Sequence, residues 1–294
     1  MSIYVVLNLN GCVIQQGQTS MKQPWQPQNT ISIQTLEINN RPIGTDWNAK
    51  NVCSSFWRLY VNNSEGAWIK LKNAKRYTLE KKRIYLIPAW VGFNCHNDQI
   101  IDHFYIHFDL LGLPGVLIRK LFTQPLELDS TRELTSLRRS LEAQPWLGTQ
   151  NTLAIEYRIQ SLLNLALSQA WDSLTHEQLD TCRMYLQGSH RFAETLQYIE
   201  EHLEHALHNA KLATFCHLSR DHFVRRFALE IGQTPAHYIR ERRIAKAAKL
   251  LRFSDASVEQ IAQQCGFTDR FHFSRVLANL TGTPPVAYRQ GQHV

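Results

Sequence analysis

The last third of the chain contains an internal repeat, and this repeat constrains the fold more than any other feature of the sequence. A shift of fifty residues places a first copy, near 219–238, on a second copy, near 269–288. The paired positions hold identical or similar residues: Ser219 and Asp269, Phe223 and Phe273, Arg225 and Arg275, Phe227 and Leu277, Gly232 and Gly282, Pro235 and Pro285, Tyr238 and Tyr288. The sequence therefore predicts two copies of one structural unit.

Each copy has the pattern of a short helix, a tight turn and a second helix. In the first copy Ser219 is placed to cap the second helix, and in the second copy Thr268 or Asp269 takes that place. Apolar side chains then recur at a spacing of four on one face of the second helix: Phe223, Phe227 and Ile231. We expect two helix-turn-helix motifs, at about 211–231 and 258–281, whose second helices lie in the DNA major groove.

The candidate DNA-binding residues are the caps and the polar or aromatic side chains of the two second helices. They are Ser219, Arg220, Asp221, His222, Arg225, Arg226, Asp269, Arg270, Phe271, His272 and Arg275. Between the copies, a helical run extends from Pro235 to about Arg252. Eighteen residues at about 1.5 Å each span roughly 27 Å, somewhat less than the roughly 34 Å of one duplex turn. Such a strut would let both second helices enter adjacent major grooves.

This region resembles the tandem helix-turn-helix domain of the AraC/XylS family of bacterial transcription regulators. The resemblance rests on an ordered series of elements: Ala213, Leu218-Ser219, Phe223, Arg225, Phe227, Gly232-Gln233-Thr234-Pro235, Tyr238, Arg243, Ala247, Leu250-Leu251, Ile261-Ala262, Gly266-Phe267, Asp269, Phe273-Ser274-Arg275, Gly282-Thr283-Pro284 and Tyr288-Arg289. It implies a sequence-specific regulator of double-stranded DNA operators that contacts RNA polymerase, with an activator as the expectation and a repressor as the alternative.

Two residues depart from the family pattern. Leu277 stands where the family usually has Phe, and Phe271 where it usually has a small polar residue. Phe271 lies two positions before Phe273, about 200° around the helix axis, so it cannot point into the same core. We expect contact with a thymine methyl group in the groove. Packing on the linker helix or the sensor domain, and chance exposure of a single apolar side chain, are the alternatives.

The charge of the chain is concentrated on the repeat. The chain carries a formal net charge of +7, and residues 211 to 294 hold 13 Lys and Arg against 6 Asp and Glu, whereas residues 1 to 210 hold 19 of each kind. A basic surface on a helix-turn-helix unit predicts salt-dependent attraction to phosphates. A merely solvated surface is the alternative.

The cysteine pattern and the absence of long apolar runs indicate a cytoplasmic protein without a membrane partner. Six cysteines are scattered without a Cys-x-x-Cys pair, which is typical of reduced, partly buried thiols. The sequence has no apolar run near the roughly 18 residues that cross a membrane, and it opens with no charged-then-apolar leader.

Residues 1 to 125 predict a β-rich domain, so that the whole chain is an α+β multidomain protein. Short alternating runs, separated by turn signals, predict a small barrel or sandwich: Thr30–Ile38, Ser54–Val61, Ala67–Leu71, Arg76–Leu79, Arg83–Pro88 and His103–Asp109. The stretch Phe56–Ala89 is similar to the cupin-like sensor domains of many AraC-type regulators. This second resemblance implies a barrel whose interior holds a small effector.

An effector site needs aromatic platforms beside a few polar groups, and the predicted strands supply a set of both kinds. The candidates are Arg58, Tyr60, Trp68, Tyr85, His103, Tyr105 and His107. A guanidinium beside indole and phenol rings suits a sugar or an organic acid. The alternative for each aromatic residue is that it fills the core, and a regulator that binds no effector is the corresponding alternative function.

An enzymatic function is the competing hypothesis for the barrel. Cupin enzymes bind a metal through two histidines one residue apart, and this chain has no His-x-His. His96, His103 and His107 are the metal-ligating candidates that remain, and unligated polar residues are the alternative. We therefore expect no cofactor, no metal and no enzymatic activity, with a metal-dependent cupin enzyme carrying a DNA-binding tail as the alternative.

Residues 126–188 predict a helical connector, and residues 189–294 the DNA-binding domain. Leu134, Leu137 and Leu141 share one helical face, and a second apolar face lies within 152–174. Two such helices resemble the dimer-forming helices of the family, so a homodimer is one expectation; packing against their own barrel is the other. The linker is predicted at 176–189.

Overall fold

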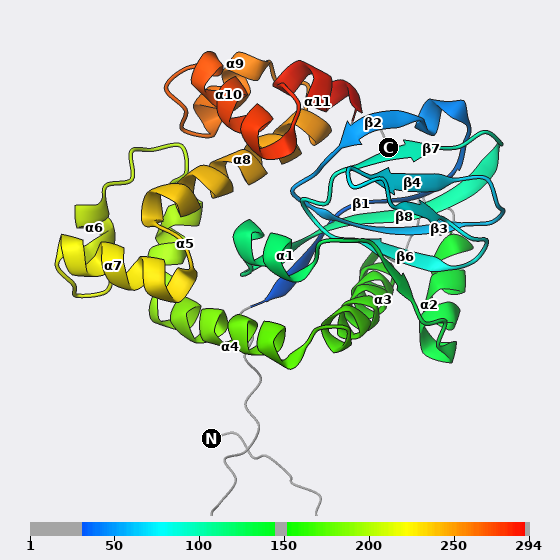
Figure 1. The fold of residues 1–294 in the computed structure, drawn as a ribbon, viewed down its shortest axis with the longest axis horizontal. Coiled ribbons are helices and arrows are strands. Elements are labelled where there is room, and N and C mark those ends of the chain that lie inside the picture. The colour runs from blue at the N-terminus through cyan, green and yellow to red at the C-terminus, as the bar shows by residue number, and fades with distance from the viewer. Residues whose placement is uncertain (1–30, 145–151, 292–294) are drawn as a thin grey trace, which may run out of the picture.

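The computed structural model describes residues 31–144 and 152–291, which form a β-rich half and a helical half (Figure 1). The first sheet has the antiparallel order β1 (Ser32–Ile43), β8 (Ile101–Leu111), β3 (Trp57–Asn62), β6 (Ile84–Ile87) and β9 (Leu126–Leu128). The second has the order β2 (Ala49–Val52), β7 (Phe93–His96), β4 (Trp68–Leu71) and β5 (Arg76–Thr78). This α+β, two-part architecture confirms the predicted fold class.

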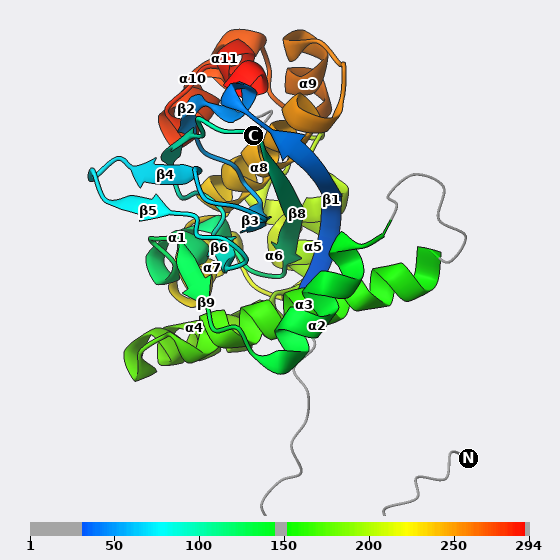
Figure 2. The same cartoon turned by 90° about the vertical axis from the view of Figure 1, so that its right-hand side faces the viewer.

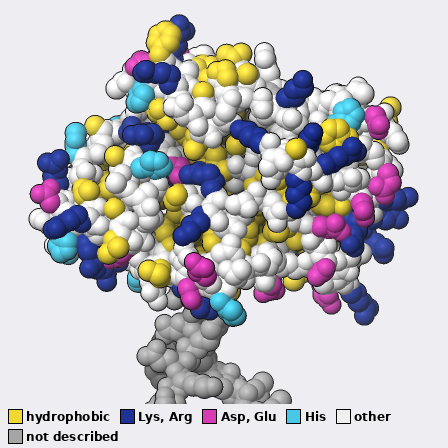
Figure 3. All heavy atoms as spheres, viewed as in Figure 1, with side chains coloured by type: hydrophobic (Ala, Val, Ile, Leu, Met, Phe, Trp, Pro, Cys, Tyr) yellow, Lys and Arg dark blue, Asp and Glu magenta, His cyan; other side chains and the backbone are white. Residues whose placement is uncertain are grey.

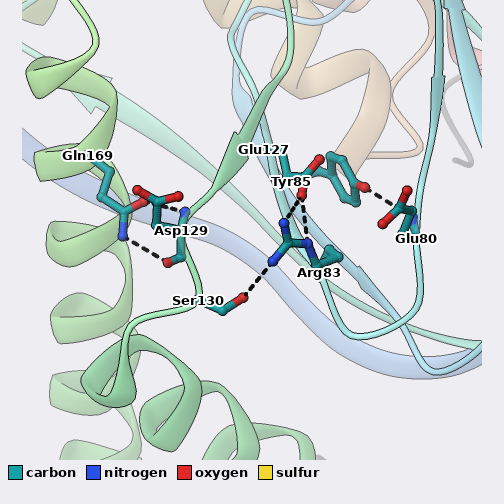
Figure 4. Close-up of polar contacts among 7 residues, drawn as sticks. All are labelled: Glu80, Arg83, Tyr85, Glu127, Asp129, Ser130 and Gln169. Atoms are coloured by element: carbon teal, nitrogen blue, oxygen red, sulfur yellow. Dashed lines mark hydrogen bonds and ion pairs between the residues drawn. The ribbon is translucent and has the colours of Figure 1, made fainter.

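The predicted runs overlap β1, β3, β4, β5, β6 and β8, of which β1, β3 and β8 extend beyond the predicted bounds, whereas β2, β7 and β9 are additional. These three strands have only three or four residues each. Strand β9 pairs with β6, so the first sheet extends past residue 125. Figure 4 shows how this edge is held: Arg83 pairs with Glu127, and the Gln169 side chain exchanges two hydrogen bonds with the backbone of Asp129.

Strand alternation gives the first sheet two different faces. On one face, Trp57, Leu59 and Val61 of β3 pack against helices in a continuous core. On the opposite face, Arg58 and Tyr60 point between the two sheets, and the register sets Tyr60 beside Tyr85 and Tyr105. The helical side of the sheet is apolar and the side facing the second sheet is partly polar.

Helices α1 (Gly115–Leu121), α2 (Arg132–Glu142) and α3 (Thr152–Asp172) cover the apolar face of the first sheet (Figure 2). The apolar stripes of α2 and α3 are buried in the same core as β3, through residues such as Leu134, Leu141, Leu162 and Leu163. The connector helices therefore pack back on their own barrel.

The segment 176–189, where the linker is predicted, is helical and forms α4 (His176–Arg191). Thr175 and Gln178 form a capping box at its start, a local signal that the sequence contains. Gly188 makes a helix look improbable, but a Cβ at Gly188 would lie 2.7 Å from Cβ of Glu230. The glycine therefore allows α4 to approach α7 closely. A tertiary contact, rather than the end of a helix, explains a glycine at this position.

Within the described residues, the helical half consists of seven further helices built around two cores. They are α5 (Ala193–Glu201), α6 (Asn209–Thr214), α7 (Arg220–Ile231), α8 (Pro235–Phe253), α9 (Val258–Gln264), α10 (Arg270–Thr281) and α11 (Pro285–Gly291). Phe223 and Phe227 of α7 lie in the core shared with the connector, while Phe273 and Leu277 of α10 lie in a separate core. Helix α8 contributes to both cores and joins the two units (Figure 1).

Candidate nucleic-acid interface

Helices α7 and α10 each begin at a side-chain cap. The Ser219 hydroxyl accepts a hydrogen bond from the amide of His222 at 3.4 Å. The Asp269 carboxylate accepts from the amides of Phe271 and His272 at 2.8 and 2.7 Å, so Asp269 rather than Thr268 is the cap. These hydrogen bonds, led by that from His272, lower the pKa of Asp269, so the carboxylate is charged at neutral pH and favours the helix N-terminus.

Both helices end in the same way, at a glycine in the left-handed conformation. Gly232 has φ 78° and Gly282 has φ 83°, values that other residues adopt only with strain. A proline begins the next helix in each copy, at Pro235 and Pro285. The caps at both ends fix two helices of 12 residues each.

The candidate residues lie on the exposed faces of these helices, with one exception. Those that are exposed are Ser219, Arg220, Asp221, His222, Arg225, Asp269, Arg270, Phe271, His272 and Arg275. Arg226 is half-buried and pairs with Glu230 at 2.7 Å, and Glu230 also pairs with Arg191 of α4. Arg226 therefore faces the connector. On the face that Figure 3 shows, Lys and Arg side chains are spread out rather than gathered in one patch.

The exposed aromatic Phe271 is in contact with its neighbour Arg270. Phe271 is 66% exposed, and the Arg270 guanidinium carbon lies 4.8 Å from the centre of its ring. Arg270 Nε also lies 3.9 Å from a carboxylate oxygen of Glu259. Phe271 thus points away from the core of its own unit, as the helical spacing predicts.

The two turns differ by one residue, which the fifty-residue shift does not reveal. The amide of Leu218 donates to the carbonyl of Ala213, and in the second copy Phe267 donates to Ala262, so the helices before the turns are related by forty-nine residues. Thr268 is the extra residue of the second turn. Where the second turn has Gly266 at φ 73°, the first has His217 at φ 53°, an unfavourable conformation for a residue with a Cβ.

Among the residues that the structure describes, three ion pairs that sequence analysis did not find tie helix α8 to the barrel. Glu241 pairs with Arg119 at 2.9 Å, Lys249 with Asp109 at 2.6 Å, and Arg252 with Glu37 at 3.2 Å. The side chains of Glu241 and Asp109 are only 3% and 5% exposed, so removing a partner would leave a buried charge. The strut between the two units is therefore held by the barrel.

The structure brings six of the seven predicted effector residues onto one face of the first sheet, between the two sheets. These six are Arg58, Tyr60, Tyr85, His103, Tyr105 and His107. Trp68 is the exception and lies apart from the other six, because Ile69 and Leu71 of β4 take the inward positions. Trp68 lies on the outer face, where its ring contacts His96 and Arg76.

Tyr85 lies at the edge of this face, where its hydroxyl accepts from the Glu80 amide at 3.1 Å (Figure 4). Trp47, which sequence analysis missed, joins the group from the turn before β2: its ring lies 5.5 Å from that of His103. Tyr60 and His103 are 4.7 Å apart. Among the described residues, four buried polar atoms here have no hydrogen-bond partner: Trp47 Nε1, Tyr60 Oη, His103 Nε2 and His107 Nε2.

Both buried histidines are neutral at physiological pH. Burial lowers the pKa of His103 to about 3 and that of His107 to about 4. His103 Nδ1 donates to Asn62 Oδ1 at 2.7 Å, and His107 Nδ1 donates to Glu37 at 3.2 Å. Since the single ring proton of each lies on Nδ1, each Nε2 is a hydrogen-bond acceptor.

A polar cavity of about 550 Å³ lies beside this group, where β1 meets the end of α8. It is lined by Glu37, Asn39, Arg41, Asp46, Tyr105, Arg252 and Phe253. Of the predicted effector residues, only Tyr105 lines it. The cavity therefore belongs to the junction between barrel and strut.

The three histidines that were metal-ligating candidates do not converge. The His96 ring lies tilted against that of Trp68 on the outer face of the second sheet, whereas His103 and His107 lie between the sheets. Within 31–144 and 152–291, no group of three or more His, Cys, Asp and Glu side chains is placed to hold a metal ion. Over the same residues, no helix is long and apolar enough to cross a membrane.

Comparison with known proteins gives matches to DNA-binding regulators. A family described as "Helix-turn-helix domain" matches residues 212–291. The MmsAB operon regulatory protein of Pseudomonas aeruginosa is 38% identical over 134 residues, which are 46% of this chain and 43% of that protein. The transcriptional activator RhaS of Escherichia fergusonii is 27% identical over 247 residues, 77% of this chain and 83% of RhaS.

A solved structure resembles the whole fold. The crystal structure of ToxT from Vibrio cholerae matches with a TM-score of 0.51 and 15% identity, over 90% of this chain and 99% of that chain. At this identity the likeness concerns the fold alone. The chain spans less than half the length of the MmsAB regulator, so the sequence similarity to that protein is confined to part of it.

Proposed function

We propose that this chain, which belongs to the AraC/XylS family of transcription regulators, binds an operator by inserting α7 and α10 into successive major grooves. The observation that carries this proposal is the pair of capped helices with exposed polar first turns, joined by α8. At about 1.5 Å per residue, the 19 residues of α8 span roughly 28 Å, which suits grooves one turn apart. The RhaS relative is a transcriptional activator, and we propose activation, with RNA polymerase as partner, for this chain as well.

The experiment is a selection of randomised duplexes by the full chain, followed by titration of the enriched sequences. We expect enrichment of two half-sites about one helical turn apart. Recovery of sequences with no common element would contradict sequence-specific binding. We propose the bacterial cytoplasm as the site of action, because the proposed operator partner lies there.

We further propose that the group between the sheets binds a small effector with several hydroxyl groups. Two Nε2 acceptors, the Trp47 donor and the Tyr60 hydroxyl are buried side by side in this group without hydrogen-bond partners among the described residues. A sugar hydroxyl can donate to a histidine and accept from an indole, whereas a carboxylate of an organic acid only accepts. The set therefore favours a sugar over an organic acid.

Thermal shift of the full chain against neutral polyols and organic acids tests this proposal, with Tyr60→Phe as the site variant. A polyol that stabilises the native chain, but not the Tyr60→Phe variant, is the expected result. Stabilisation by carboxylates alone would contradict the assignment. A response to neither class would favour the alternative of a regulator without an effector.

We propose no enzymatic activity, because the relatives named above are regulators and the candidate histidines are dispersed. Metal analysis of the purified protein tests this, since stoichiometric iron, manganese or zinc would favour the cupin enzyme. Leu153 and Tyr157 of α3 are 68% and 74% exposed, which supports a homodimer through this helix. Sedimentation of Tyr157→Lys against the native chain tests the dimer.

A further inference from the structure

Helices α7 and α10 are the second helices of the two helix-turn-helix motifs and are called the recognition helices below. They begin with the same residue and differ in the second residue. The shift of fifty pairs Arg220 with Arg270, and Asp221 with Phe271. Each arginine is the first residue of its helix, and all four side chains are exposed. The first turn of a recognition helix is the part that contacts base edges. The two copies therefore share one candidate base-contacting residue and differ in the residue beside it.

Arg270 and Phe271, the first two residues of α10, are in contact with each other. The guanidinium carbon of Arg270 lies 4.8 Å from the ring centre of Phe271. Successive bases of one strand are about 3.4 Å apart along the duplex. Two side chains in contact on one turn of a helix therefore reach the same base pair or neighbouring base pairs. When the Arg270 guanidinium lies in the plane of one base, the Phe271 ring is placed to contact the neighbouring base.

The chemistry of the major groove assigns a base to each side chain. Arginine binds the O6 and N7 atoms of guanine, aspartate accepts from the N4 amino group of cytosine, and an apolar side chain contacts the methyl group of thymine. Arg220 with Asp221 thus fits a guanine next to a cytosine. Arg270 with Phe271 fits a guanine next to a thymine.

We propose that the residue after the first arginine of each recognition helix selects the base beside a guanine: cytosine for Asp221 in α7, and thymine for Phe271 in α10. This inference rests on the proposed DNA-binding function and specifies its readout. Under this proposal the operator is asymmetric, because its two half-sites contain two different two-base sequences, called words below. The asymmetry fixes the direction in which the chain lies on the duplex.

The first test exchanges the two residues in the full chain and repeats the selection of randomised duplexes. Phe271→Asp should replace thymine by cytosine beside the guanine in one half-site, with a change of preference of roughly 5- to 150-fold. Asp221→Phe should do the converse in the other half-site, and the double exchange should reverse the order of the words. Both positions are exposed, so near-UV circular dichroism is expected to be unchanged.

The second test removes or adds one methyl group on the DNA. Uracil in place of the assigned thymine should weaken the native chain about fourfold, the effect of one buried methyl group, and should leave Phe271→Asp unaffected. Replacing that thymine by cytosine should weaken the native chain, and 5-methylcytosine should restore the loss.

The outcomes separate the inference from the function on which it rests. Exchange variants that enrich the same words as the native chain would overturn the inference while leaving sequence-specific binding intact. A native chain that enriches no sequence would overturn both. Arg275→Ala is a control outside the exchanged pair: it should change affinity without converting thymine preference into cytosine preference.

Discussion

Glu37 of the barrel and Arg252 of the strut form an ion pair of 3.2 Å at the junction of the two halves. Glu37 also accepts a hydrogen bond from the Tyr105 hydroxyl at 2.6 Å and faces His107 Nδ1 at 3.2 Å. Burial raises the pKa of Glu37, but the hydrogen bonds from His107 and Tyr105 and the charge of Arg252 outweigh it and bring the pKa to about 2. One carboxylate therefore contacts the barrel interior and helix α8 together.

The first prediction is that Glu37 and Arg252 are energetically coupled. In a double-mutant cycle with Glu37→Gln and Arg252→Met, urea denaturation should give a coupling free energy of about 0.5 to 3 kcal/mol. Arg183 and Asp180 form an exposed pair within α4 and serve as the control, for which about 0.5 kcal/mol or less is expected. Equal coupling in the two cycles would show that the junction pair adds nothing beyond a surface contact.

The second prediction concerns acid. The folded-state pKa of His107 is depressed, so its contribution to stability is complete above the unfolded value of 6.5 and declines as pH falls toward about 4. At about 1.4 kcal/mol per pH unit between the two pKa values, the loss at pH 4 is on the order of 3 kcal/mol. His107→Gln should reduce the slope of the unfolding free energy between pH 6.5 and 4. An unchanged slope would contradict the neutral, buried state of His107.

The third prediction is that His217→Gly stabilises the chain. His217 has φ 53°, a conformation that costs a residue with a Cβ about 1 to 2 kcal/mol, whereas the added freedom of glycine in the unfolded chain costs about 0.4 to 1 kcal/mol. A net gain of about 0.5 to 1 kcal/mol in the unfolding free energy is expected. Gly232→Ala is the converse control, because its Cβ would meet nothing within 4 Å and only the backbone conformation opposes it.

The fourth prediction is a steep salt dependence of DNA binding. About six phosphate contacts would give a slope of log affinity against log salt near minus five. Lys249 and Arg252 pair with the barrel, so replacing either by Met should leave the slope unchanged. Arg225→Met should reduce it by about one if Arg225 contacts a phosphate. A slope that is flat in the native chain would exclude a phosphate-dominated interface.

The fifth prediction separates base contact from other roles among the arginines. Arg270→Ala should relax the preference at one operator position by about 1 to 3 kcal/mol. Arg226→Ala, whose side chain pairs with Glu230, should leave every base preference unchanged. The measurement is a titration on duplexes that vary one position at a time. Uniform weakening on all duplexes would make Arg270 a phosphate contact.

Features with local causes could be predicted from the sequence, and features with distant causes could not. The caps at Ser219 and Asp269 and the terminators at Gly232 and Gly282 act within a few residues of their own positions, and the repeat shows each of them twice. The inward or outward direction of Trp68 depends on which neighbours bury a strand of four residues, which alternation alone does not determine.

Contacts between the two halves lie beyond sequence reasoning for the same reason. Arg119 and Glu241 are 122 positions apart, and neither stands in a motif. The capping box at Thr175 was a usable local signal for α4, but Gly188 counted against a helix until its contact with Glu230 was known. The candidate DNA interface was therefore predictable, whereas its attachment to the barrel was not.

The attachment of α8 to the barrel limits how this regulator can be recombined with its relatives. A chimaera joined at residue 189 would keep Glu37, Asp109 and Arg119 on the barrel and receive a foreign helix in place of α8. Asp109 is only 4% exposed, so its carboxylate would remain buried against the foreign helix without Lys249 as its partner. Grafting Glu241, Lys249 and Arg252 into the incoming helix would restore all three pairs. A chimaera therefore has to transfer these three side chains together, and the choice of a joining residue alone does not provide them.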